Sequence, residues 1–296
     1  MIKVSGPSTG QTVIKPSTYS DGTMKLANIN NEELFFEKDP QYIKITWLYE
    51  NEEEMILLMY LVKHFRDISE NEPKIELVMP YIPNARMDRV KNKHEIFTLK
   101  YFAEFINSLN FWKVKVLDPH SDVSLSLINK IHVDETELAP LLFMILMKIK
   151  DKDSLQNLVL YFPDASAKKR YSDLIEMLPC QCSCQGFIHK NHETGEITNV
   201  DVVCECEVSL KGKNVLIVDD IVSYGTTMYH GAKKLKELGV EKVYAFASHV
   251  EETSLHNGYG LMGKAFEENL IEKLYTTNSI YVNVPENDKV EVVYTF

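Results

Sequence analysis

The sequence lacks the features that direct a chain into or across a membrane. Residues 1–10 contain no apolar core of a secretory signal, and no apolar run approaches the roughly 20 residues that span a bilayer. The longest apolar run, Met55–Val62, has the length of a helix fragment. We therefore expect a soluble, cytoplasmic protein with no membrane partner.

Positive charge is also scarce. The 296 residues include 32 Lys and Arg against 43 Asp and Glu, which gives a formal charge of −11. Proteins that bind nucleic acid or anionic membranes usually present a basic face, so we expect no nucleic-acid partner. An anionic small substrate stays possible, because a metal ion and a few local donors can outweigh the overall field.

Cysteine is confined to one short segment. All five cysteines lie between Cys180 and Cys206, and their odd number in a long chain without a secretory signal predicts reduced thiols. Cys180, Cys182 and Cys184 alternate along the sequence, as do Cys204 and Cys206, so each set would lie on one face of a strand. If the segment is a hairpin, the two sets can form either a zinc site or a stack of small reduced side chains. The single-residue spacing favours the stack.

The remaining sequence alternates between two patterns. Apolar runs predict strands at 43–49, 75–79, 114–117, 158–162, 215–218, 243–248 and 274–280, and amphipathic patterns predict helices at 55–65, 98–109 and 231–238. Asn51 and Glu54 fit the N-cap and capping-box positions of the first helix. The alternation predicts an α/β fold with mainly parallel sheets flanked by helices. The length suggests two domains, and we place their boundary at 147/148.

Polar residues at the carboxyl ends of the strands are the first candidates for chemistry, because ligands bind there in open α/β sheets. The strand at 215–218 leads into Asp219 and Asp220, and a turn of small residues then opens a helix. This turn is Ser223-Tyr224-Gly225-Thr226-Thr227. Its N–H groups can hold a phosphate, and the carboxylates suit ribose hydroxyls or a bridging Mg²⁺. The plainer interpretation is a chance pair of aspartates that caps the helix.

The segment 215–227 resembles the phosphoribosyl diphosphate signature of the type I phosphoribosyltransferase fold. Further segments, in matching order, resemble the phosphoribosyl pyrophosphate synthetases: Tyr19-Ser20-Asp21-Gly22, Ala85-Arg86-Met87-Asp88-Arg89, Leu117-Asp118-Pro119-His120, Phe162-Pro163-Asp164-Ala165 and Thr276-Thr277-Asn278-Ser279. The resemblance implies two tandem type I phosphoribosyltransferase-like domains. Residues 1–147 would form the ATP side with the oligomer contacts, and residues 148–296 would carry the ribose phosphate loop. The last strand can return to the first domain.

The same resemblance implies an activity, which is transfer of a diphosphate from ATP to the anomeric hydroxyl of ribose 5-phosphate, with Mg²⁺ as cofactor and AMP as leaving group. It assigns ATP binding to Tyr19, Asp21, Arg86, Arg89 and His120, and metal binding to His120 and Asp164. It assigns ribose phosphate binding to Asp219, Asp220 and the turn residues Ser223, Tyr224, Gly225, Thr226 and Thr227. Lys190 and His192 would act on the transferring group from a hairpin within 180–206. Relatives of this kind form homodimers or homohexamers.

Two departures from the family pattern bear on the acceptor and on activity. Synthetases have an arginine where this chain has His192, and they have aspartate-threonine where it has Ser223-Tyr224. Histidine cannot form the two-pronged hydrogen bond of arginine. An aromatic ring in the loop suits an acceptor whose 5′-phosphate continues into a larger group, as in ADP-ribose. ADP-ribose pyrophosphate, a possible precursor for rebuilding NAD, would then be the product.

Three other functions stay open at this point. A phosphoribosyltransferase would share the Asp219-Asp220 loop without needing ATP, but the segments around Tyr19 and Arg86 count against it. A non-catalytic regulatory subunit of a synthetase assembly is suggested by His192. A redox or metal-binding protein built around the cysteines is the most distant alternative.

Overall fold

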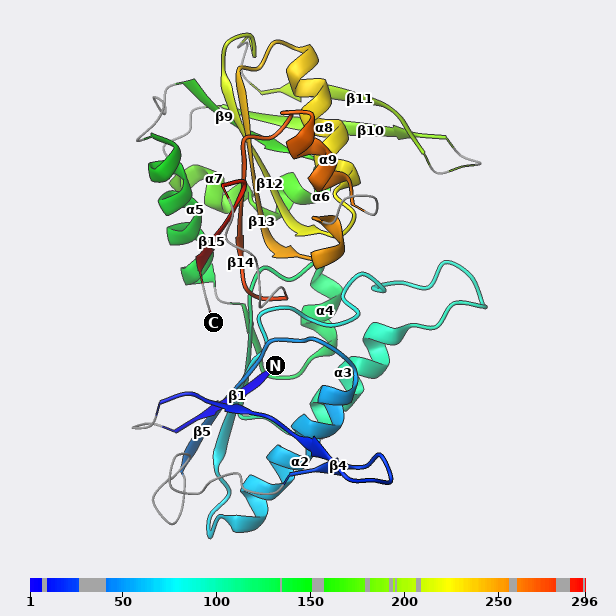
Figure 1. The fold of residues 1–296 in the computed structure, drawn as a ribbon, viewed down its shortest axis with the longest axis vertical. Helices are drawn as coiled ribbons and strands as arrows, with labels where there is room; N and C mark the ends of the chain where they lie inside the picture. The colour runs from blue at the N-terminus through cyan, green and yellow to red at the C-terminus, as the bar shows by residue number, and fades with distance from the viewer. Residues whose placement is uncertain are drawn as a thin grey trace. The chain divides into compact units, whose positions relative to one another are not determined.

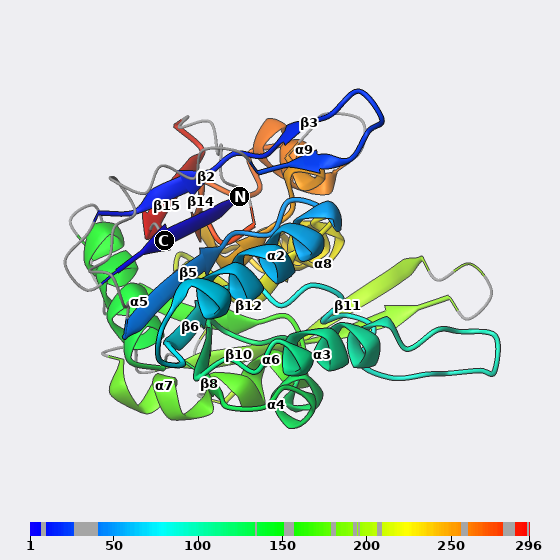
Figure 2. The ribbon, with the colours of Figure 1, turned by 90° about the horizontal axis from the view of Figure 1, so that it is seen from below.

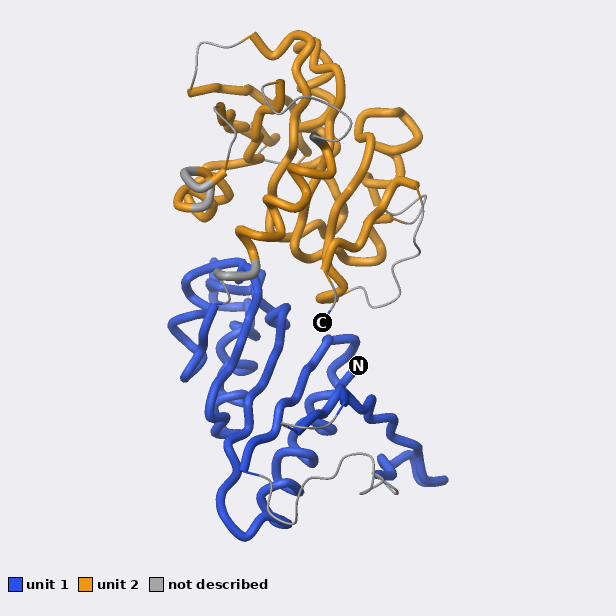
Figure 3. The backbone as a smooth tube through the Cα atoms, turned by 90° about the vertical axis from the view of Figure 1, so that its left-hand side faces the viewer, with its two compact units in different colours: residues 1–134, 296 blue, residues 135–295 orange. Residues whose placement is uncertain are grey.

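A computed structural model of the chain describes residues 1–6, 10–26, 41–133, 135–150, 157–178, 182–191, 194, 196–205, 209–255, 260–280, 288–294 and 296 (Figure 1). It divides into two units, residues 1–134 with 296 and residues 135–295 (Figure 3). Unit 2 starts with helix α5 (Glu135–Lys150), whose buried residues pack on the second sheet. The boundary proposed at 147/148 therefore falls inside a helix. Among the described residues, no helix is long and apolar enough to cross a membrane.

Unit 1 contains a six-stranded sheet in the order β2-β1-β5-β6-β7-β8. The strands are β1 (Ile2–Ser5), β2 (Thr12–Ile14), β5 (Tyr42–Trp47), β6 (Lys74–Val78), β7 (Lys113–Val116) and β8 (Ile131–Val133). β1 is antiparallel to both of its neighbours, and β5 to β8 are parallel to one another. A separate two-stranded ribbon pairs β3 (Ser17–Thr18) with β4 (Met24–Lys25). The helix α4 (Asp122–Leu127) follows β7.

Helices α2 (Glu53–Ile68) and α3 (Thr98–Ser108) lie side by side in unit 1 (Figure 2). Their apolar residues join those of the strands in one core, because buried leucines recur at helical spacing along α2 and Phe102 and Ile106 lie one turn apart on α3. Arg66 of α2 donates to the carbonyl oxygens of Leu109 and Asn110, at 2.8 and 2.9 Å, where α3 ends. These bonds hold the two helix ends together on one face of the sheet.

The predicted cap of α2 is wrong. The N-cap position is Glu52 and not Asn51, and its side chain makes no capping hydrogen bond. Glu54 is buried and accepts instead from the indole of Trp47 and from the backbone N–H of Glu50, each at 2.9 Å. A buried carboxylate needs several donors, and those beside Glu54 come from Trp47 at the end of β5, from Glu50 in the loop after it and from the ammonium of Met1. Tertiary contacts therefore displace the local capping pattern.

Unit 2 contains a seven-stranded sheet in the order β11-β10-β9-β12-β13-β14-β15. Its strands are β9 (Leu158–Phe162), β10 (Ser183–Lys190), β11 (Ile197–Cys204), β12 (Asn214–Val222), β13 (Lys242–Val250), β14 (Lys273–Thr277) and β15 (Val290–Tyr294). Among the described strands of this sheet, only the pair β10–β11 is antiparallel. Because β14 and β15 both pair within this sheet, the expectation that the last strand returns to the first domain is wrong.

Helices cover both faces of this second sheet (Figure 1). One core joins α8 (Thr226–Glu237) and α9 (Leu261–Glu267) to the face that carries Val215 and Ile217. The other core joins α5, α6 (Ala165–Arg170) and α7 (Ser172–Met177) to the face with Leu216 and Val218. A short 3₁₀ helix, η2 (Glu252–Ser254), follows β13. Alternate residues of β12 thus face different helices, which decides where its two aspartates point.

Candidate active site

The turn after β12 is held in a conformation that requires glycine. Gly225, the N-cap residue of α8, has a φ of 75°, and a Cβ placed on it would lie 2.6 Å from Cγ and 2.8 Å from the backbone N of Met262. The N–H of Leu261 donates to the carbonyl oxygen of Tyr224 at 2.7 Å. No side chain caps the twelve-residue helix α8. Its first N–H groups therefore point out of the turn, where they can bind an anion.

The turn presents both polar and aromatic groups. Thr226 and Thr227 form the first residues of α8 and are partly exposed, so their hydroxyls can add to the backbone donors. The ring of Tyr224 is 58% exposed. Ser223 donates its hydroxyl to Oε2 of Glu251 at 2.6 Å. The predicted phosphate loop thus carries an exposed aromatic ring and a hydrogen bond to a carboxylate.

Asp219 lies on the α8 face of β12, beyond Val215 and Ile217. Removal from solvent raises its pKa well above the ordinary value, and the negative charges of Asp220 and Asp164 add to this effect. Burial likewise raises the pKa of the Tyr161 hydroxyl, with contributions from the charges of Asp164 and Asp219. Asp164, Asp219 and Tyr161 therefore form one electrostatically coupled group at the carboxyl ends of the neighbouring strands β9 and β12.

Asp220 points to the opposite face. It is only 3% exposed, and Oδ1 lies 2.5 Å from Nη1 of Arg170, the last residue of α6. Strand alternation produces this arrangement, since Asp220 continues the row of Leu216 and Val218 toward α6. Sequence reasoning placed both aspartates on the ribose and did not single out Arg170. The sequence did indicate that the two aspartates point to opposite faces, because two residues adjacent in a strand cannot share a face.

Asp164 ends the loop after β9 and accepts from the backbone N–H of Ala167 at 2.8 Å, which makes it the N-cap of α6. This cap uses one carboxylate oxygen, and a carboxylate can bind a metal ion through the other. Within the described ranges, no three His, Cys, Asp or Glu side chains are gathered closely enough to hold a metal ion by themselves. Mg²⁺ usually takes one or two carboxylates together with waters and substrate phosphates, so Asp164 and Asp219 fit this ion.

The hairpin of β10 and β11 extends beyond the other strands of unit 2 (Figure 1). Lys190 ends β10 and is exposed, next to an irregularity of the strand pairing between His189 and Lys190. His189 contacts Asp201 at 2.8 Å, and this hydrogen bond lowers the pKa of the Asp201 carboxyl. His192 lies outside the described residues. Lys168 of α6 pairs with Glu205 at 2.6 Å.

The expectation of reduced thiols is wrong at the base of this hairpin. Cys184 and Cys204 are directly opposite each other and are joined by a disulfide, with 3.9 Å between their Cα atoms. Cys182 is also disulfide-bonded, whereas Cys180 and Cys206 lie outside the described residues. The hairpin and the facing thiols were predicted, but sulfurs joined in this way are not available as zinc ligands.

In unit 1, two predicted ATP-binding segments lie at the carboxyl ends of neighbouring parallel strands. The loop with Arg86 and Arg89 follows β6, and His120 follows the adjacent parallel strand β7. The pairing continues into both loops, since the N–H of Leu117 donates to the carbonyl oxygen of Pro80 at 2.9 Å. Arg86 and Arg89 are exposed, and Arg89 lies 3.5 Å from Asp88. His120 is partly exposed, so all three side chains can reach a ligand.

Tyr19 and Asp21 occupy the turn between β3 and β4. Asp21 accepts from the backbone N–H and the hydroxyl of Thr23, at 3.0 and 2.7 Å, and these bonds lower the pKa of its carboxyl. Tyr19 is 52% exposed, with the ammonium of Lys25 at 5.3 Å from its ring centre. Gly22 has a φ of 85°, which closes the turn. Asp21 thus stabilises the turn, while the ring of Tyr19 is presented to solvent.

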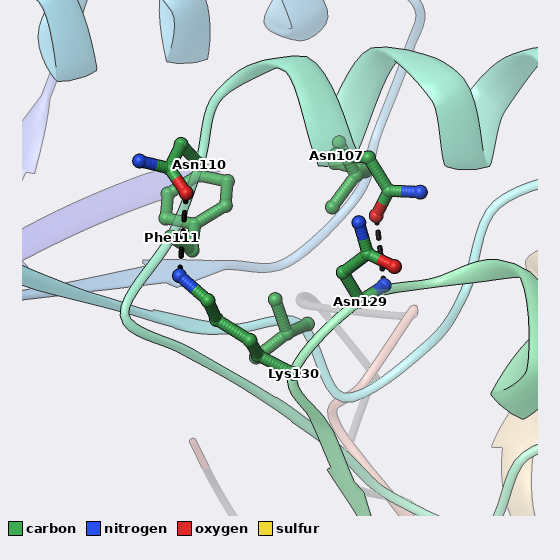
Figure 4. A pocket seen from close by; sticks show the side chains of 7 residues that line it. Asn107, Asn110, Phe111, Asn129 and Lys130 are labelled. Carbon is green, nitrogen blue, oxygen red and sulfur yellow. Dashed lines mark hydrogen bonds between the residues drawn. The ribbon is translucent and has the colours of Figure 1, made fainter.

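A small cavity of about 40 Å³ opens elsewhere in unit 1 (Figure 4). Asn107, Asn110 and Lys130 line it, and Lys130 donates to the side-chain oxygen of Asn110 at 3.2 Å. These residues lie where β7 and β8 begin, whereas the candidate site residues lie where strands end. The cavity has room for a few waters and takes no part in the site.

Comparisons with known proteins find similarity to phosphoribosyl transferases and to ribose-phosphate pyrophosphokinases. The phosphoribosyl transferase domain family matches residues 152–263. A ribose-phosphate pyrophosphokinase of Aquifex aeolicus is 29% identical over 237 residues, which are 80% of this chain and 71% of that protein. One from Thermococcus kodakarensis is 27% identical over 204 residues, or 68% of this chain and 66% of that protein.

The fold itself is similar to a solved structure. Phosphoribosylpyrophosphate synthetase from Mycobacterium smegmatis matches with a TM-score of 0.68 and 17% identity, covering 96% of this chain and 86% of that one. The expected fold class, α/β with two mainly parallel sheets flanked by helices, is confirmed. The chain is therefore similar to ribose-phosphate pyrophosphokinases in sequence over most of its length, and to a phosphoribosylpyrophosphate synthetase in fold.

Proposed function

We propose that the chain is an ATP-dependent pyrophosphokinase that transfers the β,γ-diphosphate of ATP to the anomeric 1-hydroxyl of a ribose phosphate and releases AMP. The main support is the strand end of β12, where Asp219 precedes a left-handed Gly225 and an uncapped helix start, in a chain whose relatives are named ribose-phosphate pyrophosphokinases. Members of this family generally depend on Mg²⁺ and ATP.

The proposed reaction is a single displacement at phosphorus. The anomeric oxygen forms a bond to the β-phosphorus of ATP, and the bond from that phosphorus to the α,β-bridging oxygen breaks. The bridging oxygen leaves on AMP, and the hydroxyl proton passes to solvent. The protein therefore has to align the reactants and neutralise charge, as in other phosphoryl transfers.

The residues of unit 2 are assigned to the acceptor and the metal. The turn of Ser223, Tyr224, Gly225, Thr226 and Thr227 binds the 5′-phosphate through its backbone donors and hydroxyls. Asp219 binds a ribose hydroxyl or Mg²⁺, and Asp164 binds Mg²⁺. Mg²⁺ bound there would supply positive charge to the transferring phosphates, and it would offset the repulsion that adds to burial in raising the pKa of Asp219.

Asp220 is proposed to act on the ribose together with Arg170. In this ion pair the guanidinium of Arg170 holds the Asp220 carboxylate in a fixed orientation. Lys190 and His192 are assigned to the transferring group from the β10–β11 hairpin. The exposed position of Lys190 suits this role, since a point charge on a flexible stem can follow a phosphate.

The residues of unit 1 are assigned to ATP. Arg86 and Arg89 provide positive charge for its phosphates, and His120 binds ATP and its magnesium ion. Tyr19 and Asp21 are proposed to hold adenine at a subunit interface, which requires a homodimer or homohexamer. The exposure of the Tyr19 ring in the single chain supports this assignment.

The acceptor is proposed to be ribose 5-phosphate or a 5′-extended ribose such as ADP-ribose. With ADP-ribose the product is ADP-ribose pyrophosphate, which places the reaction in NAD synthesis. The exposed ring of Tyr224 supports the longer acceptor, because an adenosine or a second ribose can pack on it.

Product analysis with ATP, Mg²⁺ and each acceptor tests the proposal. We expect AMP that depends on the acceptor, loss of AMP with Asp219→Asn, and no change with Asp173→Asn, which removes an exposed carboxylate from α7. A phosphoribosyltransferase would instead consume phosphoribosyl diphosphate and a base without ATP. Absence of AMP with every acceptor would overturn the proposal.

A further inference from the structure

The contact between Ser223 and Glu251 joins two neighbouring strand ends. Ser223 follows β12, and Glu251 follows β13, which pairs with β12 in parallel as far as Val222 and Val250. The Ser223 hydroxyl donates to Oε2 of Glu251 at 2.6 Å, and the N–H of Glu251 donates to the carbonyl oxygen of Val222 at 2.9 Å. Backbone and side chain of Glu251 are therefore both fixed against the turn.

A carboxylate at this position opposes the binding of a doubly charged phosphate. The first turn of α8 contains no acidic residue, so the negative charge reaches the turn from β13. A terminal phosphate ester carries about −1.5 to −2 charges near pH 7. A phosphate that is esterified on both sides has lost its second ionisation and is repelled less by Glu251.

The hydrogen bond also changes what Ser223 can offer. A serine hydroxyl has one hydrogen and can donate it once. While that hydrogen is bonded to Glu251, it cannot be given to a phosphate oxygen. The pair therefore withdraws one donor from the turn and adds a negative charge, and both changes weaken the binding of a terminal phosphate.

We propose that Glu251, acting with Ser223, is a specificity-determining residue that selects against ribose 5-phosphate and in favour of a ribose whose 5′-phosphate is esterified to a second group. This inference rests on the proposed function and names the acceptor class of the same site. Tyr224 adjoins Ser223 and is 58% exposed, so the second group meets an aromatic ring where a free phosphate would meet a carboxylate.

The test compares the wild-type chain with Glu251→Gln and with the control Glu252→Gln. Glutamine keeps an oxygen that accepts from Ser223, so the turn is retained while the charge is removed. Glu252→Gln removes the same charge one residue later, in η2. Binding of ribose 5-phosphate and of ADP-ribose is measured by calorimetry with Mg²⁺, and circular dichroism verifies the fold.

We expect Glu251→Gln to tighten ribose 5-phosphate binding at least about tenfold and to change ADP-ribose binding less than about threefold. Glu252→Gln should change neither, because Glu251 is the residue that bonds to the turn through Ser223, whereas Glu252 lies one residue later in η2. Equal affinities of the wild type and Glu251→Gln for ribose 5-phosphate would overturn the inference, as would equal tightening of both ligands. These measurements do not require turnover. A chain that binds acceptors as expected but forms no AMP would refute the proposed function and leave this inference standing.

Discussion

Replacing Gly225 by alanine tests whether the turn after β12 is the acceptor site. The φ of 75° at Gly225 strains any side chain, at a cost of about 1–2 kcal/mol. The new methyl group would also lie 2.6 Å from Cγ and 2.8 Å from the backbone N of Met262. Because a backbone atom cannot move aside cheaply, overpacking adds about 1–3 kcal/mol. We expect a loss of about 2–5 kcal/mol in the free energy of unfolding.

Gly212→Ala is the matched control. Gly212 has a φ of 74°, nearly that of Gly225, but a Cβ placed on it meets nothing within 4 Å. It also lies before β12, away from the candidate site. We expect this variant to lose only the backbone term of about 1–2 kcal/mol and to keep full activity.

Urea unfolding followed by circular dichroism gives both stabilities, provided that the free energy of unfolding falls with urea concentration at the same slope in both variants. AMP formation at saturating ATP and varied acceptor gives their activities. We expect Gly225→Ala to raise the KM for the acceptor, because the turn must shift away from Met262. Equal stability losses in the two variants, together with an unchanged KM, would refute this reasoning.

Three further predictions follow from the charged residues of unit 2. Arg170→Met removes the cation that pairs with the buried carboxylate of Asp220, and it should lower the free energy of unfolding in urea by about 3 kcal/mol. Adding Asp220→Asn should recover most of this loss. An Arg170→Met variant as stable as the wild type would contradict the buried pair. Lys190→Ala should reduce AMP formation about 100-fold without lowering the melting temperature, and unchanged turnover would remove Lys190 from the site. The raised pKa of Asp219 means that the folded state keeps a proton which the unfolded state releases near 3.8, so stability without Mg²⁺ should fall as pH rises from about 4 toward the folded pKa. Asp219→Asn should flatten that part of the stability profile, and an equally steep profile would contradict the shift.

The sequence predicted seven of the strands and three of the helices, because these elements carry clear local patterns. The strand at 158–162 has the bounds that were expected, and α3 differs from its prediction by one residue. β15 was missed, since Val290–Tyr294 is short and its burial does not alternate: Val290 is buried and the four residues after it are partly exposed. The cap of α2 was missed for another reason, because Glu54 takes donors from Trp47 and Glu50 that no local motif contains.

The sequence singled out residues of the candidate site, but it did not predict which side chains contact one another. The strand-end rule located Asp164 and His120, which follow parallel strands, and Asp219, which lies in the last part of β12. It applies equally to Glu251 after β13, which was overlooked because that segment belongs to no recognised motif. The salt bridge from Arg170 to Asp220 and the disulfide from Cys184 to Cys204 depend on packing between elements. Sequence spacing alone does not determine such contacts.

Phosphorus NMR of a completed reaction tests the central claim most directly. ATP, Mg²⁺ and either ribose 5-phosphate or ADP-ribose are incubated with the chain, and the phosphorus signals are assigned. The account predicts AMP and a new diphosphate on the anomeric carbon of the acceptor in equal amounts. Formation of ADP, or of AMP without an anomeric diphosphate, would contradict it.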